Sequence, residues 1–178
     1  MAIELVILDK KNKDDFILLL EKELCLIFKT SVEDLPDNYG RKYSWSLLSL
    51  IESDEIDSYQ LLYVDGKFWV GSGGMVREYN QEKIYQACFR AFSKTRGINT
   101  GIGSRSYAHE FNTSIQIERA RELGCSFVIL SFNENNKKLF DITKNFHLRR
   151  VFGDVFIPSE CPVLFNGVNQ WLLMMSLK

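Results

Sequence analysis

The chain has 178 residues, which fits one domain, and 46% of them are hydrophobic, enough to bury a core without disulfides or a metal. Lys and Arg together number 22 and Asp and Glu number 23, so the net charge is -1. A dedicated nucleic-acid binder normally has a basic excess, so this balance argues against that class. We expect one domain spanning residues 1–178.

The sequence predicts neither a targeting segment nor a metal site. The N-terminus, MAIELVILDKKNK, has no basic segment ahead of its apolar run, and no apolar stretch is long enough to span a bilayer. Cys25, Cys88, Cys125 and Cys161 form no Cys-x-x-Cys pair, and the first three lie in apolar patterns typical of core residues. We therefore expect a cytoplasmic protein with no metal and no membrane partner.

Changes in hydrophobic period divide the first half of the chain into elements. Asp65-Gly66 lies between two alternating runs and is a strong hairpin signal. Gly71, Gly73 and Gly74 in the second run indicate a bulge or close backbone packing. The predicted elements are a strand at Ile3–Leu8, helices at Asp14–Phe28 and Tyr43–Ile51, and strands at Tyr59–Val64, Lys67–Val76 and Ile84–Ser93.

In the second half, a glycine-rich connection at Lys94–Ser104 precedes a helix that ends at Leu123-Gly124. Cys125–Phe132 is apolar throughout, as in a strand buried on both faces. A short helix to about Phe146 and strands at Leu148–Ile157 and Gln170–Leu177 complete the chain, with Arg149 and Arg150 on an exposed strand face. This order predicts an α/β (α+β) fold: a mixed sheet with an antiparallel meander, one parallel crossover and helices on both faces.

The segment KTRGINTGIGSRS opens the helix that ends at Gly124. Unpaired amides at such a helix start, aided by the helix dipole, bind phosphate or pyrophosphate. The segment lacks the Gly-Lys-Ser/Thr ending of a P-loop, and in a GxGxxG pattern Ser106 replaces the third glycine. Taken alone, it fits a flexible solvated connection equally well.

The order of elements, the Gly101-Ile-Gly103 loop before a long helix, the apolar strand and the following Asn133 resemble the GNAT superfamily of acyl-CoA N-acyltransferases. The resemblance covers about Ser58–Phe146. It implies that the loop holds the pyrophosphate of acetyl-CoA and that two parallel strands part to admit the pantetheine arm. Acetyl-CoA is thus the implied co-substrate, and a small-molecule or peptide amine the implied acceptor.

The loop fits the family pattern, Arg/Gln-x-x-Gly-x-Gly/Ala, in two registers. In the first, Gly101 and Gly103 match, but Ile98 stands at the basic position and the helix is longer than the family's. In the second, which we favour, Arg105 matches and the helix length agrees, although Glu110 would face an anionic ligand. The residues that the resemblance implies for cofactor binding are Phe92, Ser93, Gly101, Gly103, Arg105, Ser106, Tyr107, Ala108, His109, Asn133 and Asn136.

The sequence names no catalytic residue. The strand at Ile84–Ser93 has no carboxylate that could act as a base, and Glu78 and Glu82 nearby are typical of solvated turns. Phe140 stands where the family has a tyrosine acid, and Tyr85 and Tyr107, which could replace it, are more typical of packing residues. Because a thiolate is a tolerable leaving group, loss of the acid slows the reaction without abolishing it.

Three functions remain in order of preference. The first is an acyl-CoA-dependent N-acyltransferase, and the second is a non-catalytic GNAT-like module that binds CoA or a partner. The third is a nucleotide or nucleic-acid binder using Lys94, Arg96 and Arg105. The sequence leaves open the acceptor, the acyl length and the oligomeric state, a homodimer included.

Overall fold

The computed structural model describes residues 2–9, 11, 14, 18, 56–92, 105–165 and 167–178. Apart from single positions, the helices predicted at Asp14–Phe28 and Tyr43–Ile51 lie outside these residues, as does the connection Lys94–Ser104. The chain divides into two compact units. One consists of Met1–Met75 and Phe89–Ile102, and the other of Val76–Cys88 and Gly103–Lys178.

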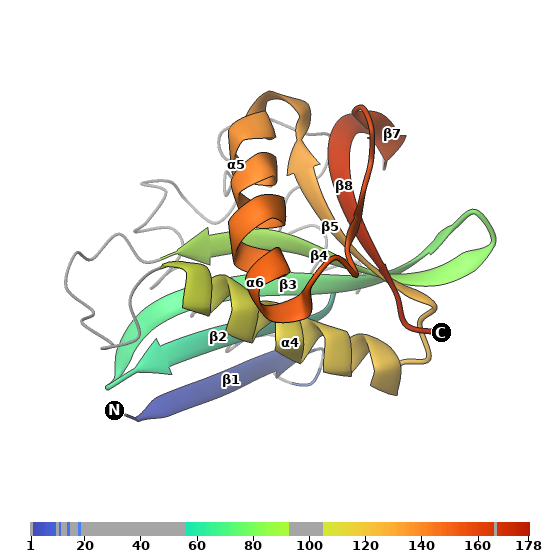
Figure 1. The fold of residues 1–178 in the computed structure, drawn as a ribbon. Coiled ribbons are helices and arrows are strands. Elements are labelled where there is room, and N and C mark those ends of the chain that lie inside the picture. Colours follow the sequence, from blue (N-terminus) through green and yellow to red (C-terminus); the bar gives the residue numbers. More distant parts are fainter. Residues whose placement is uncertain are drawn as a thin grey trace. The chain divides into compact units, whose positions relative to one another are not determined.

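The first unit contains an antiparallel meander of β1 (Ile3–Asp9), β2 (Ile56–Val64) and the first part of β3 (Lys67–Tyr79). β1 pairs with β2 along its whole length (Figure 1). Between β2 and β3, Asp65 and Gly66 both have positive φ, 48° and 73°. These are the signs of φ in a type I′ turn, so the hairpin predicted from Asp-Gly is confirmed.

Gly71 of β3 packs closely against β2. A Cβ added there would lie 2.9 Å from Cε1 of Tyr59 and 3.2 Å from Cδ2 of Leu61. Tyr59 is fully buried, so its ring cannot swing away into solvent. The close packing predicted for the strand glycines is confirmed at Gly71, because the tyrosine ring occupies the space that a side chain would need.

β4 (Glu82–Phe92) belongs to the second unit as far as Cys88, and this part of it runs parallel to β5 (Phe127–Asn133) of the same unit. α4 (Arg105–Glu122) precedes β5. β8 (Val168–Ser176) pairs antiparallel with the whole of β5, while β6 (Ile157–Pro158) and β7 (Val163–Phe165) pair with β8. The described strands follow the order β1-β2-β3-β4-β5-β8-β6. The predicted mixed sheet, with a meander and a parallel crossover, is confirmed.

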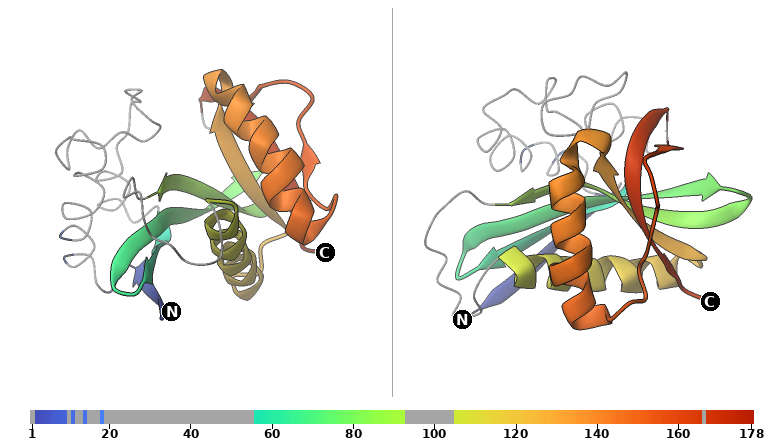
Figure 2. Two further views of the ribbon diagram at one scale, coloured as in Figure 1. Left: turned by 60° about the vertical axis from the view of Figure 1, so that its left-hand side comes forward. Right: turned by 45° about the horizontal axis from the view of Figure 1, so that its top comes forward.

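One face of these strands packs against the described helices. Ile117 and Ala120 of α4 and Phe140 of α5 (Lys137–Ile142) all belong to this core. α5 lies alongside β5 in both views of Figure 2. The strands contribute Tyr85, Ala87, Val128, Leu130, Phe132 and Leu173 to this face, and Ile84, Ile129, Phe165 and Leu172 form a second cluster on the other.

The helical segment after β5 is longer than predicted. η3 (Glu134–Asn136) leads into α5, a π-helical stretch η4 (Thr143–Leu148) and α6 (Arg149–Phe152). The strand predicted at Leu148–Ile157 is therefore wrong except at its last residue, and Arg149 and Arg150 are exposed on a helix. Leu148 and Phe152 are four positions apart, which is a helical spacing, and both pack into the core, as does Phe156 after the helix has ended.

Three smaller observations complete the fold. Gly124 follows α4 with a φ of 67°, as expected for a glycine after a helix end, and Cys125 is buried as predicted. β7 was not predicted, although the Asn-Gly dipeptide at 166–167 is a hairpin signal. Among the residues that the structure describes, no helix combines the length and the apolar character needed to cross a membrane.

Candidate functional site

The parallel pair of β4 and β5 is the centre of the candidate site. The described register runs from Ile84 opposite Phe127 to Ala87 opposite Leu130. Both strands continue beyond that last pair, β4 to Phe92 and β5 to Asn133. Ligands of open α/β sheets bind outside the carboxyl ends of parallel strands, so the residues that follow these pairs are the candidates for binding.

The predicted cofactor-binding residues lie in four described elements, apart from three that lie outside the described residues. Phe92 is the last residue of β4, whereas Ser93, Gly101 and Gly103 lie outside the described residues. The consecutive residues Arg105, Ser106, Tyr107, Ala108 and His109 are the first five of α4. Asn133 ends β5, and Asn136 ends η3.

The start of α4 has the electrostatic character of an anion site. Its first turn contains no acidic residue, while Arg119 and Arg121 lie in its last turn. The first amides of a helix have no partner within the helix, and the dipole makes that end positive. The start of α4 at Arg105 means that these amides belong to residues predicted to bind the cofactor.

Asn133 and Asn136 have different surroundings. Asn133 is buried, and its side-chain oxygen accepts a hydrogen bond of 3.0 Å from the backbone N–H of Asn135. It thereby caps η3 and fixes the turn that leaves β5. Asn136 precedes α5, is half-buried and makes no capping hydrogen bond with its side chain. The side-chain amide of Asn136 is therefore not used to cap α5.

Four uncharged polar residues gather on one face of β4, β5 and β8, where β5 ends. Side chains alternate along a strand, so Gln86, Ser131, Asn133 and Gln170 share the face of Ile84, Ile129 and Leu172. Nε2 of Gln86 donates to Oγ of Ser131 at 3.2 Å, and Nε2 of Gln170 donates to the carbonyl of Phe165 at 2.8 Å. The sequence analysis missed Ser131, because a single serine inside an apolar strand gives no periodic signal.

Phe140 lies on the opposite face, inside an aromatic cluster. It is only 3% exposed, and its ring centroid is 5.8 Å from that of Phe132 and 5.1 Å from that of Trp171. The indole N–H of Trp171 donates to the carbonyl of Glu134 at 3.0 Å. A tyrosine hydroxyl at position 140 would have to find a partner within this apolar surrounding. The phenylalanine thus has a packing role, and this position supplies no acid.

The carboxylates near β4 are either hydrogen-bonded within the fold or exposed to solvent. Glu82, at the first residue of β4, accepts hydrogen bonds of 2.6 Å from Nζ of Lys178 and from Oγ of Ser126. The bond from Lys178, and then that from Ser126, lower the pKa of the Glu82 carboxyl below its ordinary value. Glu78 is exposed, as predicted. Tyr85 is completely buried in the core, which agrees with the packing role expected for it.

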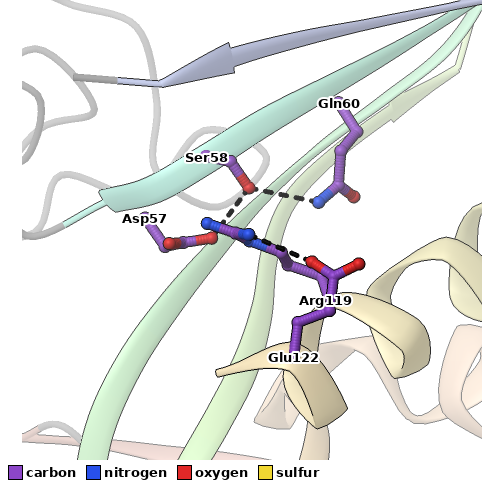
Figure 3. A network of polar contacts seen from close by, with 5 residues as sticks. All are labelled: Asp57, Ser58, Gln60, Arg119 and Glu122. Carbon is purple, nitrogen blue, oxygen red and sulfur yellow. Dashed lines mark hydrogen bonds and ion pairs between the residues drawn. The ribbon is translucent and has the colours of Figure 1, made fainter. Parts of the chain in front are cut away.

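The sequence analysis also missed polar contacts outside this region, both buried and exposed. In the first unit, Oγ of Ser58 donates to Oδ2 of Asp57 at 3.0 Å and accepts from Nε2 of Gln60 at 3.2 Å (Figure 3). In the second unit, Arg119 and Glu122 form an ion pair of 3.1 Å within α4, drawn in the same figure.

No protein-family model and no curated protein sequence matches the chain. Solved structures do match it. FeeM, an N-acyl amino acid synthase from uncultured soil microbes, gives a TM-score of 0.60 at 10% identity, covering 99% of this chain and 92% of FeeM. An acetyltransferase of the GNAT family from Streptococcus pneumoniae gives 0.54 at 14% identity, covering 99% and 100%. AAC(6')-Ib in complex with paromomycin and acetyl-CoA gives 0.55 at 7% identity, covering 99% and 94%.

These findings show that the chain has the fold of the GNAT acetyltransferases. The chain has a mixed sheet with a parallel β4–β5 pair and α4 between those two strands, and 99% of its length superposes on solved acetyltransferases with TM-scores of 0.54 and 0.55. The resemblance stated from the glycine-rich loop, the apolar strand and Asn133 is confirmed at the level of fold.

Proposed function

We propose that the protein is an acyl-CoA-dependent N-acyltransferase that passes an acyl group, in the simplest case acetyl, to an amine. The observation that supports this most is the start of α4 at Arg105, directly after the glycine-rich segment and free of acidic residues in its first turn. By name, FeeM is an N-acyl amino acid synthase, AAC(6')-Ib is an aminoglycoside acetyltransferase and the Streptococcus pneumoniae protein is a GNAT acetyltransferase; the chain is similar in fold to all three. In this proposal residues 1–178 act as one cytoplasmic domain.

The cofactor residues take roles along the donor. The first amides of α4, from Arg105 to His109, hold the pyrophosphate together with the loop at Gly101 and Gly103. Asn133 and Asn136 meet the pantetheine arm at the end of β5. Phe92 and Ser93 offer backbone groups to the thioester carbonyl, where hydrogen-bond donors stabilise developing negative charge.

The transfer is a direct displacement at the thioester carbonyl carbon. The amine nitrogen forms the new C–N bond, the C–S bond breaks, and CoA leaves as a thiolate that takes up a proton. The amine loses its own proton to water. Because Phe140 has no proton to give, the thiolate is protonated from solvent, and the protein contributes mainly position and charge stabilisation.

Thermal unfolding with acetyl-CoA tests the proposal first. A ligand that binds only the native state at about a hundred times its Kd adds about 2.7 kcal/mol to the free energy of unfolding. Release of free CoA thiol is then measured with spermidine, tyramine, glycine and a short peptide with a free N-terminus. An acetyl-CoA shift with amine-dependent thiol release supports the enzyme. If acetyl-CoA fails to raise the midpoint, the donor assignment is wrong.

The second candidate is a module that binds CoA without turnover. It is favoured by Phe140, whose burial between Phe132 and Trp171 removes the acid from the position where the family has one. A thermal shift with acetyl-CoA and no thiol release with any amine of the panel would support this module over the enzyme.

A further inference from the structure

The two faces of the β4–β5 pair differ in chemistry around Ala87 and Leu130, the last described pair of the two strands. On the face of α4 and α5 the surroundings are aromatic and apolar, with Phe132 and Phe140 in contact. On the other face Gln86 and Ser131 form a polar pair that bridges the two parallel strands.

We infer that Ser131, held by Gln86, positions the acceptor amine for attack on the thioester. This inference rests on the proposed function and adds to it the face from which the amine approaches. Ser131 is half-buried and Gln86 is buried, so the serine is the member of the pair that a ligand can reach. Gln86 acts through Ser131 and is a positioning residue.

The hydrogen-bonding capacity of Ser131 suits an amine. A serine oxygen has two acceptor lone pairs, and Gln86 donates to only one of them, at 3.2 Å. The second lone pair can accept an N–H of the acceptor, which leaves the nitrogen lone pair free to face the thioester. Gln86 fixes the serine rotamer, because it crosses from the neighbouring strand.

The uncharged side chains described on this face bear on the protonation state in which the amine binds. Among the side chains that the structure describes on this face, Ile84, Ile129, Asn133, Gln170 and Leu172 are buried and carry no charge. Burial disfavours an ammonium ion and lowers its pKa. The acceptor class is therefore an amine that enters unprotonated, and its own ionisation sets the rise of the rate with pH.

Two variants with a control test the inference, using the full chain and the amine of the panel with the highest kcat/KM. Ser131→Ala removes one hydrogen bond, so kcat/KM for the amine falls by about tenfold while the acetyl-CoA thermal shift is unchanged. Ser131→Thr keeps the hydroxyl and retains most of the activity. Ser176→Ala, an exposed serine at the far end of β8, leaves kcat/KM as it was.

The variant Gln86→Glu tests the positioning role through the pH dependence of kcat/KM, which a purely structural role of Gln86 would leave unchanged. A carboxylate at position 86 can no longer donate to Oγ of Ser131, and its charge favours the ammonium form of an amine bound at Ser131, so kcat/KM at neutral pH falls relative to its value at alkaline pH. Unchanged acceptor kinetics in Ser131→Ala, or a loss of acetyl-CoA binding in place of a loss in acceptor kinetics, overturns the inference and leaves the proposed function standing. No turnover in the unchanged protein overturns both.

Discussion

The rings of Phe140 and Trp171 lie 5.1 Å apart between centroids and 30° from parallel, although the two residues belong to elements far apart in the sequence. The contact joins α5 to β8, and Phe132 of β5 completes it edge-on. The segment that follows Asn133 is thereby fixed to the sheet, so the position of the proposed pantetheine contacts depends on an aromatic cluster.

Truncation of this cluster should therefore cost stability. Phe140→Ala is expected to lower the free energy of unfolding by about 3–5 kcal/mol, because it leaves a cavity next to Phe132 and Trp171. Urea denaturation measures the change. The matched control is Phe146→Ala in η4, where the ring is 68% exposed and the expected change is within about 0.5 kcal/mol. Equal losses in the two variants would contradict the packing role of Phe140.

Gly71 tests the close approach of β3 to Tyr59. Gly71→Ala should lower the free energy of unfolding by about 1–3 kcal/mol, because the new methyl group would overlap a buried ring that cannot move aside. Gly124→Ala is the comparison: nothing lies within 4 Å of its added Cβ, and only the φ of 67° opposes it, at about 1 kcal/mol. The Tyr59→Leu background should relieve most of the Gly71→Ala loss, and a double-mutant cycle with no coupling would refute the steric explanation.

The ion pair at the start of β4 predicts a pH dependence of stability. The folded-state pKa of Glu82 lies below its ordinary value of 4.5, chiefly through Lys178 and then Ser126. The stabilisation is therefore complete above about pH 5, where the unfolded carboxyl is also ionised, and is lost as the pH falls through the lowered folded-state value. Wild type should exceed Glu82→Gln in stability at pH 7 and lose that advantage in acid. Lys178→Gln should remove most of the pH-dependent difference, and a difference that stays constant from pH 7 to pH 3 would exclude this linkage.

A negative charge at the start of α4 should separate ligand binding from helix stability. Ser106→Glu places a carboxylate near the positive end of the helix, which favours the helix by about 0.3–1 kcal/mol but repels a pyrophosphate. We expect acetyl-CoA binding about tenfold weaker, measured by calorimetry, with an unchanged or higher unfolding midpoint. Arg121→Glu in the last turn should do the reverse, weakening the helix slightly and leaving binding alone. Tight binding in Ser106→Glu would place the pyrophosphate elsewhere.

Two buried threonines form a matched pair for the polar interior of the second unit. Thr143 in η4 is fully buried and its hydroxyl has no hydrogen-bond partner, whereas the equally buried Thr113 of α4 makes a polar interaction. Thr143→Val should leave the free energy of unfolding unchanged or raise it, and Thr113→Val should lower it by about 1 kcal/mol. Losses of the same size in both would show that Thr143 has a partner in solution.

The sequence predicted those features that depend on neighbouring residues alone. The Asp65-Gly66 turn, the strands on either side of it and the glycine that ends α4 were confirmed, because turn chemistry and a period of two are local properties. The apolar β5 and the glycine-rich segment before α4 were sufficient to indicate the GNAT fold.

Tertiary structure alone decided the rest. Leu148 and Phe152 are compatible with a strand or a helix until their common packing into the core selects the helix. The hydrogen bond between Gln86 and Ser131 and the contact between Phe140 and Trp171 join strands and helices that no local pattern brings together. A sequence period reports the face on which a residue lies, whereas its partners across the sheet follow from register and packing, which involve the whole chain.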